Sequence, residues 1–480
     1  MIVISRHFEN KAILCKIGQM EIEFRNLPSV DKVLSDERVK RLGESFPHTL
    51  LVSLARQRLE RERLSILAGN KCSALDEIVE SLLAQVETLE NPSLRPVINA
   101  AGVILHTNLG RASLSEEAVK AVNIARNFCN LEFDLDSGTR GSRYVHIEPL
   151  LCQLTGAEAA LVVNNNASAV LLGLIALARR KEVIVSRGQA VEIGGGFRIP
   201  DVMRQSGAKL VEVGTTNCTY MRDYEDAISP RTMALMRVHS SNFKVVGFTT
   251  EISLEDMVAV GKRNNLIILD DLGSGCFMDT TEYGLAPEPM VQQSVAIGAD
   301  LTFFSGDKLV GGPQAGIIVG KKHLVDRLKK HPLTRAVRTD KIRLAALEAT
   351  LIHYLKGEAV NKVPIWRMIS APLEEIERRA GNWAQALGGI ARVVEGESMV
   401  GGGSLPGGTL PTRLLAIGGT GKKSRNLAQI LSRQLRSQKI PVIARISDDV
   451  LLLDPRTVLP EEDEIVLQTL RSLAAGSKEA

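Results

Sequence analysis

Hydrophobic positions in the first ninety residues recur at spacings of three and four. The pattern covers the stretches LPSVDKVLSDERVKRL, PHTLLVSLARQRLERERLSILAG and ALDEIVESLLAQVETLE, the last of which ends just before Asn91-Pro92. Such spacing is typical of amphipathic helices that bury one face. We therefore expect a helical N-terminal domain over residues 1–92. Residues 1–19 relate poorly to the rest of this domain, and we expect them to be an extension, with Met20 as an alternative start.

The pattern changes near residue 95. Short apolar runs such as AALVV, EVIVS, LIILD and LTFF then alternate with helical stretches. This alternation predicts an α/β domain over residues 93–360, with a mostly parallel sheet covered by helices on both faces. In such folds, ligands bind at the carboxyl ends of the strands.

The last part of the chain has a different order of elements. A strand (RLLAI), a helix (KSRNLAQILSRQLRS), a hairpin (PVIARISDDVLLLD) and a final helix come after the glycine-rich stretch 401–408. We expect residues 361–480 to form a small α+β domain.

Composition narrows the class of protein. The 480 residues are too many for one compact core, and 44% hydrophobic and 24% charged residues are ordinary values for a soluble globular protein. No apolar run is long enough to span a bilayer, and the N-terminus lacks the features of a signal peptide. The six cysteines are far apart and form no CxxC metal or redox motif. We expect a cytoplasmic protein without a metal site or membrane attachment.

Charge is distributed unevenly, although the net charge is only +4. Eight basic and three acidic residues between Arg38 and Lys71 leave a local excess of +5. A run of this kind, taken alone, is usually a solvated helix face. The alternative is a surface that contacts nucleic-acid phosphates.

One lysine stands at a position suited to covalent chemistry. The stretch Ser305-Gly306-Asp307-Lys308 comes directly after the strand LTFF and precedes Gly311-Gly312. A lysine that is desolvated just past a buried strand can form a Schiff base near neutral pH, and the glycines let a flat cofactor approach the backbone. The tetrapeptide alone would equally suit a solvent-exposed turn.

Two further motifs strengthen the case. Asp271 ends the strand LIILD, where a carboxylate can pair with a pyridine nitrogen. The stretch Asn164–Ala169 comes after the strand AALVV, and its backbone at Asn166, Ala167 and Ser168 can bind a phosphate at the start of a helix. Each motif alone could be a turn or a helix cap. Their order along the chain, with Ser305 beside the lysine, predicts a pyridoxal 5'-phosphate (PLP) site of the aspartate-aminotransferase type.

The sequence also resembles the family of bacterial selenocysteine synthases, the L-seryl-tRNA(Sec) selenium transferases. The resemblance runs from about residue 27 to the end and is densest between 95 and 355. The matching stretches include RPVINAAGVILHTNLGRA, VVNNNASAVLL, VSRGQAVEIGGGFRIPDVM, EVGTTN, VHSSNF, DLGSG, FFSGDKLVGGPQAGIIVGKK and HPLTRAVRTDKIRLAALEATL.

This resemblance implies a PLP enzyme of fold type I that converts seryl-tRNA(Sec) to selenocysteinyl-tRNA(Sec) with selenophosphate. The implied route is a β-elimination to aminoacrylyl-tRNA and then addition of selenium. The family's PLP lysine falls on Lys308, and the arginines that bind the anionic substrate fall on Arg111, Arg335 and Arg338. His239 is a candidate neighbour of the cofactor, and a structural role for it is an equal alternative.

The family further implies a homodecamer, a ring of five dimers with each active site at a dimer interface. It assigns tRNA binding to the N-terminal helical domain, and RNA helices are recognised mainly by shape and backbone contacts.

Two other functions remain open. The first is a PLP-dependent lyase of the same superfamily that acts on a small free amino acid. Such an enzyme would not need the basic helical domain. The second is a tRNA-binding protein with a decayed catalytic site, which the intact Lys308 and Asp271 argue against.

Overall fold

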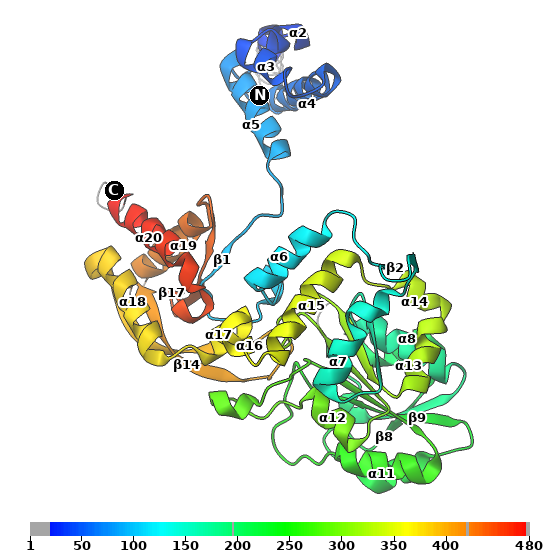
Figure 1. Ribbon diagram of the computed structural model, residues 1–480. Helices are drawn as coiled ribbons and strands as arrows, with labels where there is room; N and C mark the ends of the chain where they lie inside the picture. Colours follow the sequence, from blue (N-terminus) through cyan, green and yellow to red (C-terminus); the bar gives the residue numbers. More distant parts are fainter. Residues whose placement is uncertain (1–19, 194–195, 419–421, 477–480) are drawn as a thin grey trace, which may run out of the picture. The chain divides into compact units, whose positions relative to one another are not determined.

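The computed structural model describes residues 20–193, 196–418 and 422–476 (Figure 1). The chain divides into two compact units, one up to Pro96 and one from Val97 onward. The first unit contains the helices α2 (Val30–Leu34), α3 (Glu37–Leu42), α4 (His48–Leu67) and α5 (Leu75–Glu90).

Short polar side chains fix the starts of the first two of these helices. Ser29 accepts a hydrogen bond from the Lys32 N–H (3.2 Å), and Asp36 accepts one from the Arg38 N–H (2.9 Å). These caps satisfy N–H groups that a helix start leaves without partners. The helices then pack around a core of their own: Val33, Val39, Leu51, Leu54, Ala55, Leu59, Ile78, Val79, Leu82 and Val86.

The second unit is built on a seven-stranded sheet. Its order is β4-β12-β11-β10-β9-β5-β8. The strands are β4 (Ala159–Val163), β5 (Glu182–Ser186), β8 (Lys209–Val213), β9 (Thr232–Val238), β10 (Ile267–Gly273), β11 (Leu301–Ser305) and β12 (Gly316–Gly320). Only β12 runs antiparallel to its neighbours in this sheet. The prediction of a mostly parallel sheet is confirmed.

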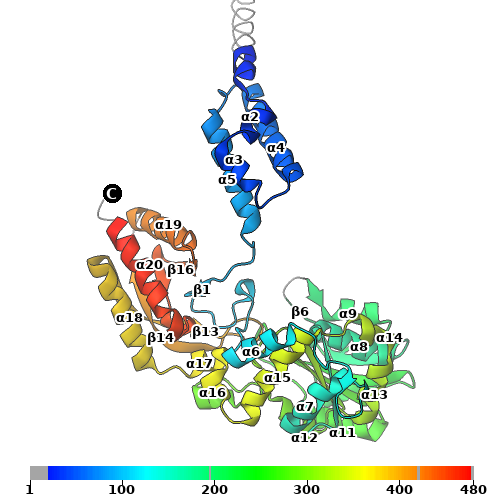
Figure 2. The ribbon, with the colours of Figure 1, turned by 45° about the horizontal axis from the view of Figure 1, so that its top comes forward.

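Helices cover both faces of this sheet (Figures 1 and 2). On β11, Phe303 packs into one core cluster and the next residue, Phe304, into another, because successive side chains of a strand point to opposite faces. The Phe303 face is covered by α8 (Asn166–Ala178), α9 (Ile199–Ser206) and α13 (Lys322–Lys330). The opposite face is covered by α7 (Glu148–Thr155), α11 (Leu254–Asn264), α12 (Val291–Ile297) and α15 (Lys341–Leu355).

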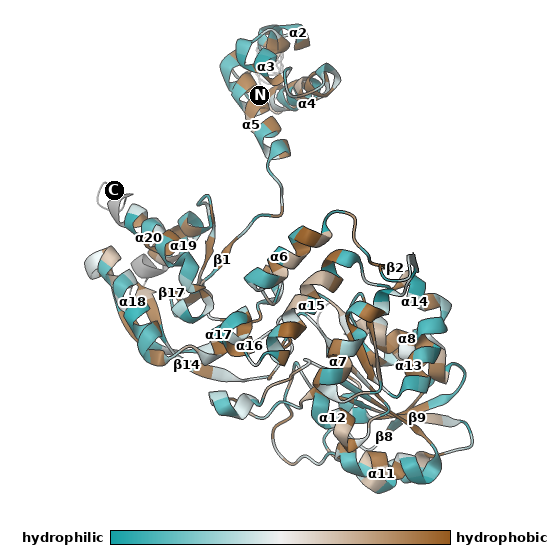
Figure 3. Ribbon diagram, viewed as in Figure 1, coloured by the Kyte–Doolittle hydropathy of each residue, from teal (hydrophilic) through white to brown (hydrophobic). Residues whose placement is uncertain are grey.

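A smaller antiparallel sheet lies nearer the C-terminus, in the order β13-β14-β17-β16. Its strands are β13 (Ala391–Met399), β14 (Thr409–Ile417), β16 (Arg445–Ser447) and β17 (Val450–Leu453). It packs with α18 (Leu373–Leu387), α19 (Lys422–Arg436) and α20 (Asp463–Gly476). Figure 3 shows hydrophobic and hydrophilic residues alternating around helices such as α6 (Glu116–Ala125) and α18.

The first strand of the second unit joins this C-terminal part. Strand β1 (Ile98–Asn99) pairs in parallel with β15 (Val442–Ile443), and Ile98 and Ala100 belong to the C-terminal core cluster. Residues that come directly after the N-terminal helices are thus packed with the end of the chain. Across the described residues, no helix is long and apolar enough to cross a membrane.

Candidate active site

Lys308 lies in the turn after β11 and is 5% exposed. Two glycines line its amine: a Cβ at Gly403 would lie 3.2 Å from Lys308 Nζ, and one at Gly273 would lie 3.8 Å away. Both have positive φ angles, +75° and +67°, which suit glycine. Burial, together with the nearby Arg111 guanidinium, lowers the pKa of Lys308. A larger fraction of this amine is therefore neutral, which is the nucleophilic form.

Asp271 lies near the end of β10 and is 3% exposed. Its Oδ1 accepts hydrogen bonds from Asn166 Nδ2 (2.8 Å) and from the Gly273 N–H (3.1 Å). Burial raises the pKa of Asp271 to about 6, against an ordinary value of 3.8, although the Asn166 hydrogen bond and the charge of Lys308 lower it. A buried carboxylate with a raised pKa is suited to receive a positively charged partner.

The neighbouring Asp270 is engaged elsewhere. It points to the opposite face of the sheet and pairs with Arg237 through two hydrogen bonds of 2.6 and 2.8 Å. Of these two consecutive acids, only Asp271 shares the sheet face of α8 and interacts electrostatically with Lys308.

The proposed phosphate loop forms the start of α8. Asn165 caps this helix, because its Oδ1 accepts the Ser168 N–H (2.9 Å). The N–H groups of Asn166 and Ala167 are then the donors that this helix start offers to an anion. Ser305 is close to the loop, because it pairs with Gly316, where a Cβ would lie 2.1 Å from the Asn165 carbonyl oxygen.

His239 connects this site to a cavity of about 480 Å³. Its backbone N–H donates to the Asp271 carbonyl oxygen (2.8 Å), and its Nε2 lies 3.4 Å from Glu288 Oε1. Both side-chain atoms are buried and have no hydrogen-bond partner among the described residues. The cavity is also lined by residues of five separate segments: Ser186, Gly188, Thr216, Asn217, Phe243, Lys244, Gly284, Leu285, Leu405 and Thr409, among others.

Arg111 adopts an unusual backbone conformation, with a φ of 65°. Its guanidinium Nη1 donates to Asp307 Oδ2 (2.8 Å), next to Lys308 in sequence. Left-handed backbone at a residue other than glycine is strained and often occurs at functional sites. The geometry therefore places Arg111 beside the lysine turn.

Arg335 and Arg338 lie in a different place. Arg335 belongs to the short helix α14 (Pro332–Ala336). The backbone of Arg338 forms an isolated β-bridge with Val163 at the end of β4. Both line a pocket of about 370 Å³. In the described part of the chain, no hydrogen bond or ion pair joins Arg111 to Arg335 or Arg338. The three arginines predicted to bind one anion thus fall into two groups.

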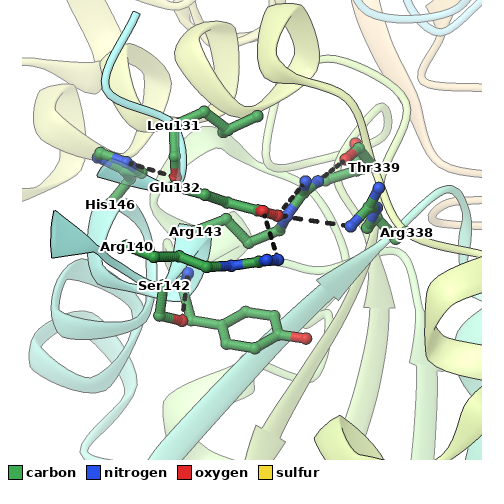
Figure 4. A network of polar contacts seen from close by, with 9 residues as sticks. Leu131, Glu132, Arg140, Ser142, Arg143, His146, Arg338 and Thr339 are labelled. Carbon is green, nitrogen blue, oxygen red and sulfur yellow. Dashed lines mark hydrogen bonds and ion pairs between the residues drawn. The ribbon is translucent and has the colours of Figure 1, made fainter. Parts of the chain in front are cut away.

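The same pocket contains residues that sequence reasoning missed. Figure 4 shows Arg140, Arg143 and Arg338 converging on the carboxylate of Glu132. The available signal was the density of arginines in the stretch TRGSRY. Gly403 was missed in the same way, although it belongs to the glycine-rich stretch 401–408.

Lys308, Asp271 and the start of α8 fit PLP by their chemistry. The Lys308 amine makes no hydrogen bond or ion pair within 4 Å to the described residues, and the buried Asn166 Oδ1 is also without a partner. Asp271 offers an acid, and the start of α8 offers N–H donors. The fold is that of the PLP-dependent enzymes of the aspartate-aminotransferase type.

Comparison with known proteins names the family within that class. A family model described as L-seryl-tRNA selenium transferase matches residues 97–459, and one described as selenocysteine synthase N terminal matches residues 24–63. The chain belongs to the L-seryl-tRNA selenium transferase family, and the resemblance seen in its sequence is confirmed.

Individual relatives agree. The chain is 48% identical over 464 residues to an L-seryl-tRNA(Sec) selenium transferase of Desulfomicrobium baculatum, covering 94% of this chain and 99% of the relative. It is 48% identical over 463 residues to the enzyme of the same name from Geobacter sulfurreducens, covering 94% and 99%. A solved structure of a D-glucosaminate-6-phosphate ammonia-lyase is similar in fold, with a TM-score of 0.58 and 23% identity over 82% of this chain and 98% of that one.

Proposed function

We propose that this chain converts seryl-tRNA(Sec) to selenocysteinyl-tRNA(Sec) with selenophosphate, using PLP held by Lys308. The observation that carries the proposal is the buried pair of Lys308 and Asp271 at the carboxyl ends of adjacent strands, in a chain of this family. Its test is direct: the purified protein, given seryl-tRNA(Sec) and selenophosphate, should form selenocysteinyl-tRNA(Sec). A protein that instead deaminates a small free amino acid would favour the lyase alternative.

The proposed role of each residue of the site follows from its position. PLP, when bound, supplies an electron sink for the negative charge that develops at the α-carbon of the seryl group. Lys308, whose pKa is lowered by burial, can hold the cofactor and then take the α-proton onto Nζ. Asp271 can keep a proton at the ring nitrogen, and its hydrogen bond from Asn166 fixes its orientation. The N–H groups of Asn166 and Ala167, with Ser305, are placed to bind the cofactor phosphate.

The arginines bind the second substrate in this proposal. Arg111 is held against Asp307 beside Lys308, and Arg335 and Arg338 line the basic pocket. Guanidinium groups bind phosphate oxygens in pairs, which suits a phosphate-bearing selenium donor. Since the two groups of arginines are separate within one chain, a partner subunit that brings them together is consistent with an active site at a dimer interface.

Exposed apolar side chains support assembly into the homodecamer. Phe128 is fully exposed in the single chain, and Ile124, Leu135, Val246 and Phe248 are each more than 70% exposed. Large apolar groups gathered on a surface commonly mark subunit contacts. A cytoplasmic location is consistent with an aminoacyl-tRNA substrate.

Replacing Arg335 and Arg338 together with alanine should impair selenium delivery and leave cofactor binding intact. Neither residue touches Lys308 or Asp271, so the visible absorbance of bound PLP should be unchanged. We expect the KM for selenophosphate to rise roughly 10²-fold, because two charge-assisted contacts to one phosphate are lost. Steady-state kinetics with varied selenophosphate measures this effect. An unchanged KM would contradict the assignment.

The N-terminal unit is proposed to bind the tRNA, and its charges are of two kinds. Arg58 is 13% exposed and pairs with the buried Glu62 (2.5 Å), which also accepts the Ser73 N–H (2.7 Å). Arg58 therefore stabilises the packing of α4. Arg56 and Arg61 on the same helix are exposed and have no acidic side chain within 4 Å in the described part of the chain.

Deleting residues 1–92 should leave a PLP-bearing core that has lost most of its affinity for seryl-tRNA. The second unit has its own core and the whole cofactor site, whereas the deleted part carries the +5 segment. In the full chain, the Arg56→Gln/Arg61→Gln variant should weaken tRNA binding and lower its salt dependence, because fewer phosphate contacts release fewer counterions. Filter binding at several salt concentrations measures the tRNA affinity and its salt dependence, and sizing of the truncated core reports its state of assembly. Full tRNA affinity in a core of native size would show that the RNA site lies elsewhere.

A further inference from the structure

Glu132 is the point at which three arginines meet (Figure 4). Its Oε1 accepts hydrogen bonds from Arg143 Nη2 (2.5 Å) and Nε (2.9 Å) and lies 3.4 Å from Arg338 Nη1. Its Oε2 lies 3.3 Å from Arg140 Nη2. One carboxylate thus faces three guanidinium groups, and the hydrogen bonds from Arg143 lower its pKa.

The three arginines are held with very different strength. The Arg143 side chain is 12% exposed and also donates Nη1 to the Thr339 carbonyl oxygen (2.9 Å). Arg143 and Glu132 therefore tie the segment before β2 (Phe133–Asp134) to the Arg338–Thr339 segment. The Arg338 side chain is 38% exposed, and its one polar contact within the described residues is the long 3.4 Å contact to Glu132, so it can turn to another anion without breaking a strong bond.

The pocket around them carries an excess of positive charge. Arg140, Lys330, Arg335 and Arg338 line it, and Glu132 is the one acidic residue among its described lining residues. Neither Lys330 nor Arg335 has an acidic side chain within 4 Å in the described ranges of the chain. The pocket adjoins the start of α8, because the Asn164 N–H donates to the Val337 carbonyl oxygen (2.8 Å).

We propose that Glu132 is the positioning residue of this pocket: by clamping Arg143 it holds the Arg338 segment in place to bind the phosphate group of the second substrate. The inference rests on the proposed function of Arg335 and Arg338. On anion binding, Arg338 exchanges its long contact with Glu132 for a phosphate oxygen, while Arg143 keeps Glu132 as its partner. Glu132 itself does not touch the substrate.

Two physical effects of Glu132 on an anion have opposite signs. As a negative charge in the pocket it repels phosphate, so its removal would tighten phosphate binding. As the clamp of Arg143 it orders the arginines, so its removal would weaken phosphate binding. The direction of the change in affinity therefore distinguishes a positioning role from that of a simple counter-charge.

The test uses the PLP-loaded enzyme, in which the cofactor fills its own phosphate site, and inorganic phosphate as the probe. Glu132→Gln keeps the shape of the side chain but presents an amide NH2 to a guanidinium. Glu132→Asp keeps the charge but shortens its reach. We expect phosphate affinity, measured by ³¹P NMR titration, to fall roughly ten-fold in the first variant and several-fold in the second. The KM for selenophosphate should rise in parallel, with little change in kcat at saturation or in the KM for seryl-tRNA.

Glu158→Gln is the matched control, because it removes the same charge at the other end of β4, where Glu158 pairs with Lys321 outside the pocket. This variant should bind phosphate as the wild type does. Each variant is first checked for wild-type PLP absorbance and unfolding temperature, and if Glu132→Gln does not fold, Glu132→Asp decides. Tighter phosphate binding in Glu132→Gln, or unchanged binding in Glu132→Asp, would overturn the inference. If phosphate binding is also insensitive to the Arg335→Ala/Arg338→Ala variant, the anion site of the proposed function is wrong as well.

Discussion

Replacing Lys308 with alanine should abolish covalent retention of PLP and reduce turnover below detection. Lys308 is 5% exposed and its amine lies against Gly273 and Gly403, and the alanine side chain offers no amine at this position. The variant loses both the covalent link and the base at the α-carbon, and loss of a positioned base alone slows catalysis roughly 10²–10⁴-fold. Borohydride reduction of the wild-type holoenzyme, with peptide mapping afterwards, should place the cofactor label on Lys308, and the alanine variant should carry no label.

Lys321→Ala provides the matched control. Lys321 comes after β12, as Lys308 comes after β11, but its side chain is 45% exposed and pairs with Glu158 (3.0 Å). A solvated lysine that is paired with a carboxylate should accept no label. Label on any lysine other than Lys308 in the wild-type enzyme would show that the site is assigned wrongly.

Local sequence patterns were sufficient for the framework of the site. Each strand of the large sheet is a short apolar run, and the carboxyl ends of neighbouring parallel strands meet at one edge. Asp271 on β10 and Lys308 after β11 are therefore brought together by strand order alone. The family resemblance added the expected roles of the arginines, which the spacing of LTRAVRTDK could not have supplied.

Contacts between segments far apart in the sequence could not be predicted from local patterns. The hydrogen bond between Asn166 and Asp271 joins residues 105 apart, and β1 pairs with β15 near the other end of the chain. Periodicity indicates which face of an element is buried, but not which partner covers it. The same limit applies to Arg58: a count of charges does not distinguish it from the exposed arginines of its helix, because its partner Glu62 is an acid that packing has buried.

Asp271→Asn should retain PLP but lower turnover by about 10²-fold or more, the size of effect seen when one preorganised electrostatic partner is removed. The amide oxygen can still accept the hydrogen bonds from Asn166 and Gly273, so the local structure should persist. An amide cannot hold a proton at the ring nitrogen, and the developing negative charge then loses its sink. Single-turnover elimination from seryl-tRNA measures the loss, and a near-normal rate would show that another acid serves the ring.

The same substitution should stabilise the protein once the cofactor is removed. Because burial raises the pKa of Asp271 to about 6, the folded chain binds this proton more tightly than the unfolded chain, whose carboxyl titrates near 3.8. The stabilisation is thus complete below pH 3.8 and is lost as the pH rises through 6. Above pH 6 the buried charge costs about 3 kcal/mol. Cofactor-free Asp271→Asn should therefore unfold a few degrees higher than the cofactor-free wild type at pH 7.5, with about half that advantage at pH 5.

Asp270→Asn is the control, in which the folding stability should change in the opposite direction. Asp270 is fully buried and holds the Arg237 guanidinium through two short hydrogen bonds, so its replacement leaves the charge of Arg237, whose side chain is 19% exposed, without its partner. Breaking a buried ion pair in this way typically costs several kcal/mol, roughly 3–5 kcal/mol. Thermal unfolding of both cofactor-free variants across pH 5–7.5 separates the two roles: relative to the wild type, Asp271→Asn should gain stability as the pH rises, and Asp270→Asn should be less stable throughout. A loss of stability in cofactor-free Asp271→Asn at pH 7.5 would mean that the carboxylate already has a cationic partner within the protein. It would then not be available to pair with a protonated ring nitrogen of the cofactor.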